Sequence, residues 1–271
     1  MEFNKIDVKA DSRGDWFKIV PLGDVHVGNS NCDMQAFKDM VDWIKNKDKC
    51  MWVGMGDYID AINYSDKRFD PKTISTKYLI EGDIDKCIQM QIQDFVDIVE
   101  PIKDKCIGLL RGNHEETIRQ HYHYDVLYEL AKELELPRKM LLYDTAVLRL
   151  HFKIFGQKRN YDVFLAHGNV GGRSPGVKAN RIHELHKFFQ ADIYLLAHSH
   201  IKQAQLSTLL YFNNRGTLCK KKIVDAYTGC FLRGYERDKT SYVEKWLFPP
   251  TDIGSIKIEL KPETGDKHVS L

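Results

Sequence analysis

The stretch that decides the fold is residues 50–57, CMWVGMGD, an apolar run that ends in Gly56 and Asp57. We interpret this run as a short buried strand. Residues 16–24, WFKIVPLGD, form a second apolar run with the same ending, and between the two runs residues 33–47 place apolar side chains at helical spacing. The order strand, helix, strand predicts a βαβ unit and therefore an α/β fold.

The remaining elements are expected on both sides of this unit. Residues 2–9 are predicted to form a hairpin with the strand that begins at Trp16. After Asp57 we expect a loop or lid insertion at 62–82, a helix at 83–100, a third buried strand within 105–116 and one helix through 117–135. The second half is predicted to be rich in strands, beginning with one at 141–152, and to hold one helix near 178–190.

Composition indicates an ordinary globular protein of 271 residues, which we expect to form a single domain over residues 1–271. The net charge of +2 excludes a strongly basic nucleic-acid binder of the kind that relies on overall charge. The six cysteines contain no CxxC pair, so neither a zinc knuckle nor a redox dithiol is predicted, and we expect reduced thiols. The polar N-terminus and the lack of a run of about 20 apolar residues predict a cytoplasmic protein with no membrane partner. The sequence does not fix an oligomeric state.

Several predicted strands end in residue types that bind metals. They are Asp24 and His26 in GDVH, Asp57 in GDYID, Asn113 and His114 in RGNHE, His167 in AHG, and His198 and His200 in AHSH. Ligands of open α/β sheets bind beyond the carboxyl ends of the strands, so we expect these side chains to converge at one edge. If the strand before AHSH continued through it, its two histidines would face the same side.

Carboxylate, amide and imidazole ligands suit Mn²⁺, Fe, Zn²⁺ or Ni²⁺, whereas the absence of cysteine argues against a structural zinc site. The remaining histidines that we considered lack this position after a strand. They are His121, His123, His151, His183 and His186. Of these, His183 and His186 are three residues apart on a predicted helix and are interpreted as surface residues.

With these motifs the sequence resembles the calcineurin-like metallophosphoesterase superfamily. The blocks DVH, GDYID, GNHE, HG and AHSH occur in the family's order over roughly residues 17–205, and Ala197 replaces the glycine of the last block. The resemblance implies a four-layer αββα sandwich with two mixed β-sheets. It also implies two divalent metal ions, with Mn²⁺ favoured over Fe, Zn²⁺ or Ni²⁺.

Carried over to this chain, the family pattern assigns each residue a role. One ion would be held by Asp24, His26 and His200, the other by Asn113, His167 and His198, and Asp57 would bridge both. Hydrolysis would proceed by a hydroxide that bridges the two ions. His114 would supply a proton to the leaving group, with Asp60 orienting it. Asp60 as a turn-capping residue is the alternative.

The family includes enzymes that act on different phosphoesters. Ala61 and Ile62 stand where the serine/threonine phosphatases have Arg-Gly, and AHSH is similar to the phosphodiesterase and DNA-repair nuclease branch, which includes bacteriophage proteins. We therefore expect hydrolysis of a phosphodiester in a nucleotide or in a nucleic acid such as DNA. A phosphomonoesterase and a non-catalytic metal-binding scaffold are the alternatives.

Basic residues near the last two motifs are candidates for substrate binding. The loop GNVGGRSPGVKANR (168–181) carries Arg173, Lys178 and Arg181 before a predicted helix, where backbone N–H groups and guanidinium groups can bind phosphate. Arg233 could line the same site. Solvated charges on a flexible loop are the alternative for these residues.

Overall fold

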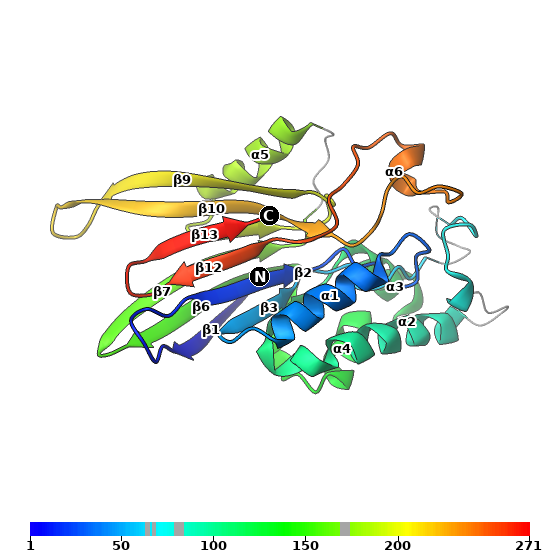
Figure 1. The fold of residues 1–271 in the computed structure, drawn as a ribbon, viewed down its shortest axis with the longest axis horizontal. Coiled ribbons are helices and arrows are strands. Elements are labelled where there is room, and N and C mark those ends of the chain that lie inside the picture. The colour runs from blue at the N-terminus through cyan, green and yellow to red at the C-terminus, as the bar shows by residue number, and fades with distance from the viewer. Residues whose placement is uncertain (63–65, 67–68, 79–83, 169–173) are drawn as a thin grey trace.

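Strands that are distant in the sequence are neighbours in the structure (Figure 1). The computed structural model describes residues 1–62, 66, 69–78, 84–168 and 174–271. Its strands are β1 (Glu2–Lys9), β2 (Phe17–Leu22), β3 (Cys50–Gly54), β4 (Cys106–Leu110), β5 (Leu141–Tyr143), β6 (Thr145–Ile154), β7 (Gln157–Ala166), β8 (Ile193–Leu196), β9 (Lys202–Phe212), β10 (Leu218–Cys230), β11 (Gly254–Ser255), β12 (Lys257–Lys261) and β13 (Asp266–Ser270). Its α-helices are α1 (Met34–Lys45), α2 (Ile84–Val99), α3 (Asn113–Tyr122), α4 (Val126–Glu133), α5 (Pro175–Glu184) and α6 (Tyr242–Lys245). Short 3₁₀ turns are η1 (Thr76–Tyr78), η2 (Glu100–Lys105), η3 (Arg138–Met140) and η4 (Leu185–Lys187).

The described strands form two mixed sheets. In the first sheet the order is β13-β12-β2-β3-β4-β5, in which β2 to β5 are parallel and β12 is antiparallel to β2. In the second sheet the order is β1-β6-β7-β8-β10-β11, and β9 pairs with β10. The β2–α1–β3 unit is present as predicted, because both strands are buried on both faces and α1 packs its apolar side on the sheet.

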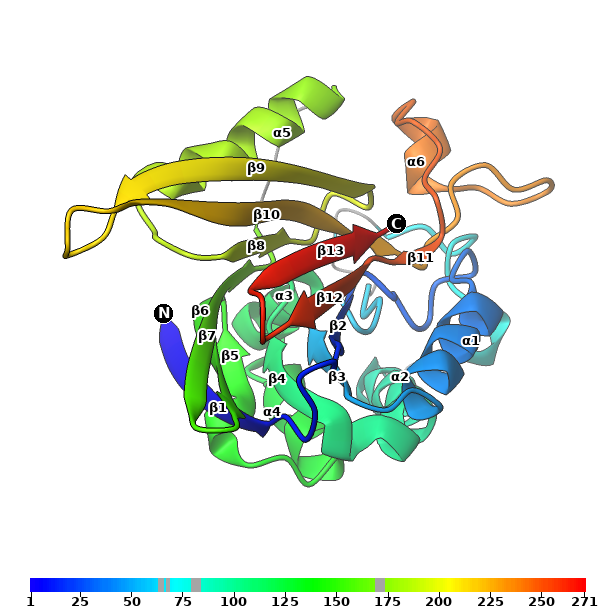
Figure 2. The same cartoon turned by 60° about the vertical axis from the view of Figure 1, so that its left-hand side comes forward.

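The two sheets pack face to face between layers of helices, as Figure 2 shows. Alternate side chains of one strand serve different layers: Val53 of β3 lies between the sheets, whereas Trp52 packs toward the helices α1, α2 and α4. On the far side, Ile182 of α5 packs on Phe164 and Tyr194 of the second sheet. The predicted four-layer αββα sandwich is therefore confirmed.

Three local predictions were wrong. The N-terminal segments do not form a hairpin, because β1 pairs in parallel with β6, with Ile6 opposite Leu150, and β2 belongs to the other sheet. The helix predicted over 117–135 is two helices, α3 and α4, separated at His123, whose φ is 55°. The single strand predicted at 141–152 is β5 and β6, which belong to different sheets.

The described part of the predicted lid at 62–82 forms the turn η1 and pairs Ile74 with Asn29. Residues 63–65, 67–68 and 79–82 lie outside the described residues, and the lid stays a prediction. Along the ranges that the structure describes, every helix falls short of the length and hydrophobicity needed to cross a membrane.

Candidate metal centre

Loops from both sheets meet where five strands end. The loops follow β2, β3 and β4 of the first sheet and β7 and β8 of the second. They carry all seven predicted metal ligands: Asp24, His26, Asp57, Asn113, His167, His198 and His200. Because the two sheets pack face to face, residues up to 176 positions apart reach one site, as expected from the carboxyl ends of parallel strands.

The backbone at this site is unusual. Five of the predicted ligands have positive φ: Asp24 (48°), His26 (55°), Asp57 (52°), His198 (65°) and His200 (54°). Non-glycine residues rarely adopt this left-handed region, and such strain is concentrated at functional sites. The condition for strand alternation, a strand that continues through AHSH, is not met because β8 ends at Leu196. The two histidines of AHSH converge through these left-handed turns. Ala197, which replaces the family's glycine, is not among the residues with positive φ.

One group of ligand types consists of Asp24, His26 and His200. The Nε2 atoms of His26 and His200 are 3.2 Å apart, and Nε2 of His200 is 3.5 Å from Oδ1 of Asp24. Asp24 and His26 are buried. Among the described residues Oδ1 of Asp24 makes no hydrogen bond. A buried carboxylate oxygen without a hydrogen bond is costly, and a cation held between Asp24 and the Nε2 atoms of the two histidines would satisfy it.

A second group consists of Asp57, Asn113, His167 and His198. Oδ1 of Asn113 is 2.7 Å from Nδ1 of His198 and 3.1 Å from Nε2 of His167. The other ring nitrogen of His167, Nδ1, donates to the carbonyl of Met55 at 2.7 Å. That hydrogen bond fixes the tautomer in which Nε2 is available as a ligand.

Asp57 lies between the two groups. Its Oδ2 is 3.3 Å from Nε2 of His167 and 3.9 Å from Nε2 of His26. Its Oδ1 accepts a hydrogen bond from the backbone N–H of His114 at 2.9 Å. A carboxylate in this position can contact a cation in either group, and the donor set of carboxylate, amide and imidazole fits divalent ions.

The charges at the centre are strongly coupled. Burial acts to raise the pKa of Asp57, but His167 and His114 outweigh it and hold that pKa well below its usual range. Burial likewise opposes the charged form of His167, yet Asp57 and Asp24 raise its pKa to about 10. Without a cation, protons on histidine therefore balance the carboxylates. Metal binding requires neutral imidazole, so an ion would replace these protons.

His114 and Asp60 are close together, but their contact differs from the expected one. Nδ1 of His114 donates to the backbone carbonyl of Asp60, while the Asp60 carboxylate is 3.9 Å away. That carboxylate is nearer to Nδ1 of His26, at 3.4 Å, and accepts from Asn29 at 3.2 Å. Asp60 therefore positions His114 through its main chain and contacts His26 through its side chain.

Glu115 is a residue of the centre to which sequence reasoning gave no role. Its buried carboxylate accepts backbone N–H groups of Asp57 (2.9 Å), Tyr58 (2.8 Å) and Gly112 (2.9 Å). Burial and the charge of Asp57 raise the pKa of Glu115 to about 7. Its position as the last residue of GNHE was the available signal.

Gly112 allows the loop after β4 to lie close against the loop after β3. A Cβ atom at Gly112 would lie 2.1 Å from Oδ1 of Asp57, so no larger residue fits without moving that carboxylate. The glycine of GNHE is therefore explained by packing against the GDYID loop.

The four predicted substrate-binding residues have different surroundings. Lys178 is buried and donates to the carbonyl of Ser199, between His198 and His200, at 3.1 Å. Arg181 is exposed in an ion pair with Glu184. Arg233 donates to Asp33 and Glu236. Arg173 lies outside the described residues. Of the described three, Lys178 is the one that contacts the AHSH loop.

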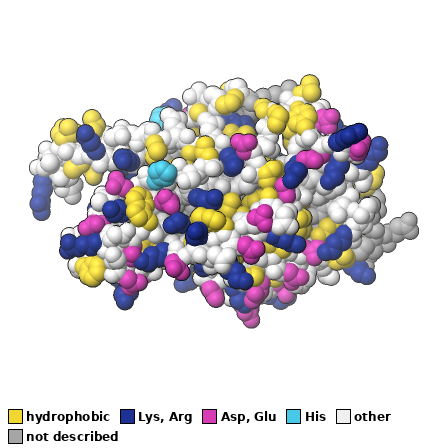
Figure 3. All heavy atoms as spheres, in the orientation of Figure 1, with side chains coloured by type: hydrophobic (Ala, Val, Ile, Leu, Met, Phe, Trp, Pro, Cys, Tyr) yellow, Lys and Arg dark blue, Asp and Glu magenta, His cyan; other side chains and the backbone are white. Residues whose placement is uncertain are grey.

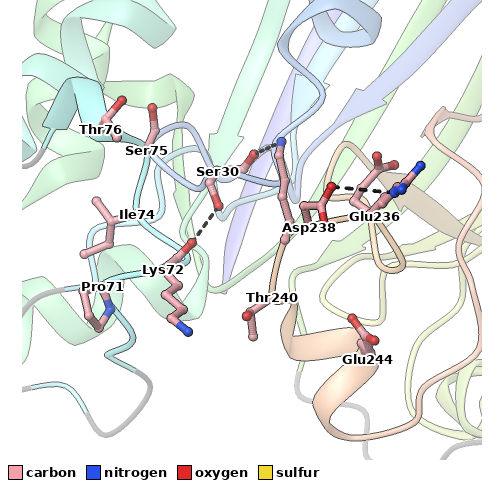
Figure 4. A pocket seen from close by; sticks show the side chains of 12 residues that line it. Ser30, Pro71, Lys72, Ile74, Ser75, Thr76, Glu236, Asp238, Thr240 and Glu244 are labelled. Atoms are coloured by element: carbon pink, nitrogen blue, oxygen red, sulfur yellow. Dashed lines mark hydrogen bonds and ion pairs between the residues drawn. The ribbon is translucent and has the colours of Figure 1, made fainter.

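A cavity of about 860 Å³ lies between residues 71–76 and 236–244 (Figure 4). Ser30 lines the cavity. The residue before it, Asn29, donates a hydrogen bond to Asp60, so one wall of the cavity is next in sequence to a residue that contacts the centre. Its lining combines Lys72, Arg237 and Lys239 with Glu236, Asp238 and Glu244. This mixture of charges does not focus positive potential on one phosphate.

The solved structures to which this chain is similar have low sequence identity and low TM-scores. No curated protein matches the chain. Among solved structures, Vps29 from Entamoeba histolytica complexed with zinc has a TM-score of 0.41 and 10% identity, covering 94% of this chain and 97% of its own. A metallophosphoesterase from Sphaerobacter thermophilus has a TM-score of 0.37 and 11% identity, with 94% and 89% covered. A predicted phosphoesterase from Streptococcus pneumoniae has a TM-score of 0.34 and 9% identity, with 91% and 84% covered.

The decisive comparison is with a family model. The model of the calcineurin-like phosphoesterases matches residues 17–202, a range that contains all of the motifs from GDVH to AHSH. The protein belongs to the calcineurin-like phosphoesterase family.

Proposed function

We propose that the protein hydrolyses phosphodiester bonds in a nucleotide or nucleic acid such as DNA, using two divalent metal ions. The observation that carries this proposal is the pair of ligand groups that share Asp57. Asp24, His26 and His200 would hold one ion, and Asn113, His167 and His198 the other. Two ions held this way supply Lewis acidity for the phosphate oxygens and lower the pKa of water.

His114 is proposed to protonate the leaving oxygen. Since Nδ1 donates to the carbonyl of Asp60, a carbonyl that can only accept, the ring nitrogen that can exchange a proton with substrate is Nε2. A side chain held by such a contact needs no reorientation before proton transfer, which is the requirement for a general acid.

The charge near the centre supports a diester over a monoester. A phosphomonoester carries nearly two negative charges at neutral pH, whereas a diester carries one. Of the basic candidates that the structure describes, Lys178 alone contacts the AHSH loop, and the buried Ala61 stands where the phosphatases have arginine. On the face shown in Figure 3, basic and acidic side chains are interspersed, so a nucleic acid would have to be bound locally.

Turnover of two model substrates tests this proposal. With Mn²⁺ added, we expect kcat/KM for bis-p-nitrophenyl phosphate to exceed kcat/KM for p-nitrophenyl phosphate. The reverse preference would favour the phosphomonoesterase. Absence of turnover for both substrates, in protein shown by metal analysis to hold two ions, would favour a non-catalytic scaffold.

Two further properties belong to this proposal. Mn²⁺ is the proposed ion, with Fe, Zn²⁺ or Ni²⁺ as alternatives, and restoring activity to chelator-treated protein with each ion would rank them. A cytoplasmic location is proposed because all six cysteines are free thiols, which is typical of a reducing compartment.

A further inference from the structure

A second cluster of metal-ligand types lies on the outer face of the second sheet, beneath α5. It consists of His183 in the last turn of α5, His186 in the turn η4, and Asp225 in β10. Ile182 of α5 packs with Tyr194 of β8 and with Ile223 and Tyr227 of β10, so the helix covers this face of the sheet. No motif in the sequence connects Asp225 with the two histidines, which were interpreted as surface residues.

Asp225 is a carboxylate in apolar surroundings. It lies on the same face of β10 as Ile223 and Tyr227, which pack in the apolar layer under α5. Its side chain is only 2% exposed. Among the residues that the structure describes, its one side-chain hydrogen bond comes from Nε2 of His186, at 2.7 Å. A carboxylate has about four acceptor positions, and burying it with one donor is costly unless a cation compensates.

The two histidines are placed to complete a cation site. Nδ1 of His183 is 3.9 Å from the second oxygen of Asp225. Zinc ligands at about 2.0–2.1 Å in tetrahedral geometry are about 3.3 Å apart, and the observed distances of 2.7 and 3.9 Å lie on either side of that value. The His186 ring packs on Tyr194, with centroids 4.4 Å apart, which restrains its orientation.

We propose that His183, His186 and Asp225 bind a divalent transition-metal ion of the Zn²⁺ class. Two imidazoles and one carboxylate are a donor set that zinc uses, and water completes the coordination. The side chain of His183 is 64% exposed, so an ion reaches the site from solvent. This site is separate from the phosphoesterase centre and does not depend on the proposed reaction.

An ion at this site would hold the end of α5 against the sheet. The other half of the helix is joined to the phosphoesterase centre, because Lys178 donates to Ser199 and its own carbonyl accepts from Tyr227. Tyr227 is two residues from Asp225 on the same face of β10. The ion would therefore stabilise the position of the helix that carries Lys178.

The test compares His183→Ala with a matched control, His268→Ala. His268 is 62% exposed and its Nδ1 is 3.9 Å from a carboxylate oxygen of Glu259, and no third ligand type joins this pair among the residues that the structure describes. The full chain is loaded with Zn²⁺ and dialysed, zinc is counted by metal analysis, and anomalous diffraction at the zinc edge locates each ion. Asp225→Asn, which keeps an oxygen to accept from His186, is a second variant.

The expected result is an anomalous peak between the three side chains in the wild type and in His268→Ala. In His183→Ala and Asp225→Asn that peak should be lost, with about one zinc fewer per chain. Even outer-shell partners change metal affinity by about 10–100-fold, so loss of a direct ligand should weaken zinc binding at least about tenfold. Equal zinc content in His183→Ala and His268→Ala, or no peak in the wild type, would overturn the proposal and leave a hydrogen-bonded His–Asp pair. Phosphodiester turnover enters neither measurement, so failure here is distinct from failure of the proposed function.

Discussion

The candidate metal centre and the cluster beneath α5 both contain histidine and aspartate side chains but are built differently. At the centre, loops after five strands bring the ligands together, and five of these residues have positive φ. The cluster beneath α5 needs only a helix end, the turn that follows it and the middle of a strand, and none of its three residues has positive φ. Backbone strain therefore distinguishes a centre that is assembled from loops from a cluster that regular secondary structure provides.

The largest effect is expected where the two ligand groups of the centre are joined. In Asp57→Asn the side chain loses its negative charge, and a neutral amide oxygen is a much weaker bridging ligand between two cations than a carboxylate oxygen. We expect loss of two-ion occupancy and of nearly all turnover, with the fold retained. Metal analysis, circular dichroism and diester kinetics measure these outcomes. Asp162→Asn, which breaks an ion pair with Arg149 on β6, is the control and should keep full activity. Two ions and normal turnover in Asp57→Asn would show that the centre is assigned wrongly.

The next effect separates proton transfer from metal binding. His114→Asn should keep the ions but lose about 10²–10⁴-fold in rate, the usual contribution of a general acid. The loss should be large for a nucleotide diester, whose alkoxide needs a proton, and small for an aryl ester, whose phenolate departs unaided. His121→Asn, on the exposed side of the same helix, should change neither rate. An equal loss on both substrates would assign His114 to positioning, and loss of an ion would make it a ligand.

A smaller effect concerns the support of the strained loop at Asp57. One oxygen of Glu115 accepts from the backbone N–H groups of Asp57 and Gly112, and the other accepts from that of Tyr58. In Glu115→Gln an NH₂ group replaces one of these oxygens. This buried NH₂ donor would face backbone N–H donors, which should lower the free energy of unfolding by about 1–3 kcal/mol. Denaturant unfolding measures this change. Glu116→Gln, on the next position of α3 and partly exposed with Arg119, should cost less than about 1 kcal/mol. Similar losses in the two variants would contradict the role given to Glu115.

The smallest effect is expected on α5, the helix that carries both Lys178, which contacts the AHSH loop, and His183 of the cluster beneath it. Lys178→Met removes the buried ammonium group that donates to the AHSH loop, and we expect kcat/KM to fall about tenfold, the scale of one charged hydrogen bond. Arg181→Met, one turn further along on the exposed face, should change kcat/KM little. If Arg181→Met had the larger effect, the substrate would approach from the exposed side of the helix.

Local patterns in the sequence predicted most of the elements and the ligand types of the centre. The βαβ unit was correct because α1 and its flanking strands have strong periodicity of their own. The prediction of an N-terminal hairpin was wrong because β1 forms its hydrogen bonds with β6, whereas β2 forms its hydrogen bonds with β3 and β12 in the other sheet. The break between α3 and α4 was missed because His123, a residue with no strong helix-ending preference, adopts the left-handed conformation there.

The sequence by itself determined which chemistry the centre can hold. Asp, Asn and His at the ends of successive strands are sufficient to indicate divalent cations, because a ligand's preference for a metal depends on its own atoms. Their order along the chain was sufficient to indicate the family, since motif spacing is a property of the sequence.

Only the tertiary structure decided how the side chains meet. The left-handed turns at His198 and His200, the Glu115 carboxylate beneath the Asp57 loop and the pairing of Asp225 with His186 join residues from different elements. Such contacts form only when the two sheets pack and exclude water, because burial gives a single hydrogen bond or charge pair its large energetic weight. No local pattern carries that information, since the partner of each group lies tens of residues away.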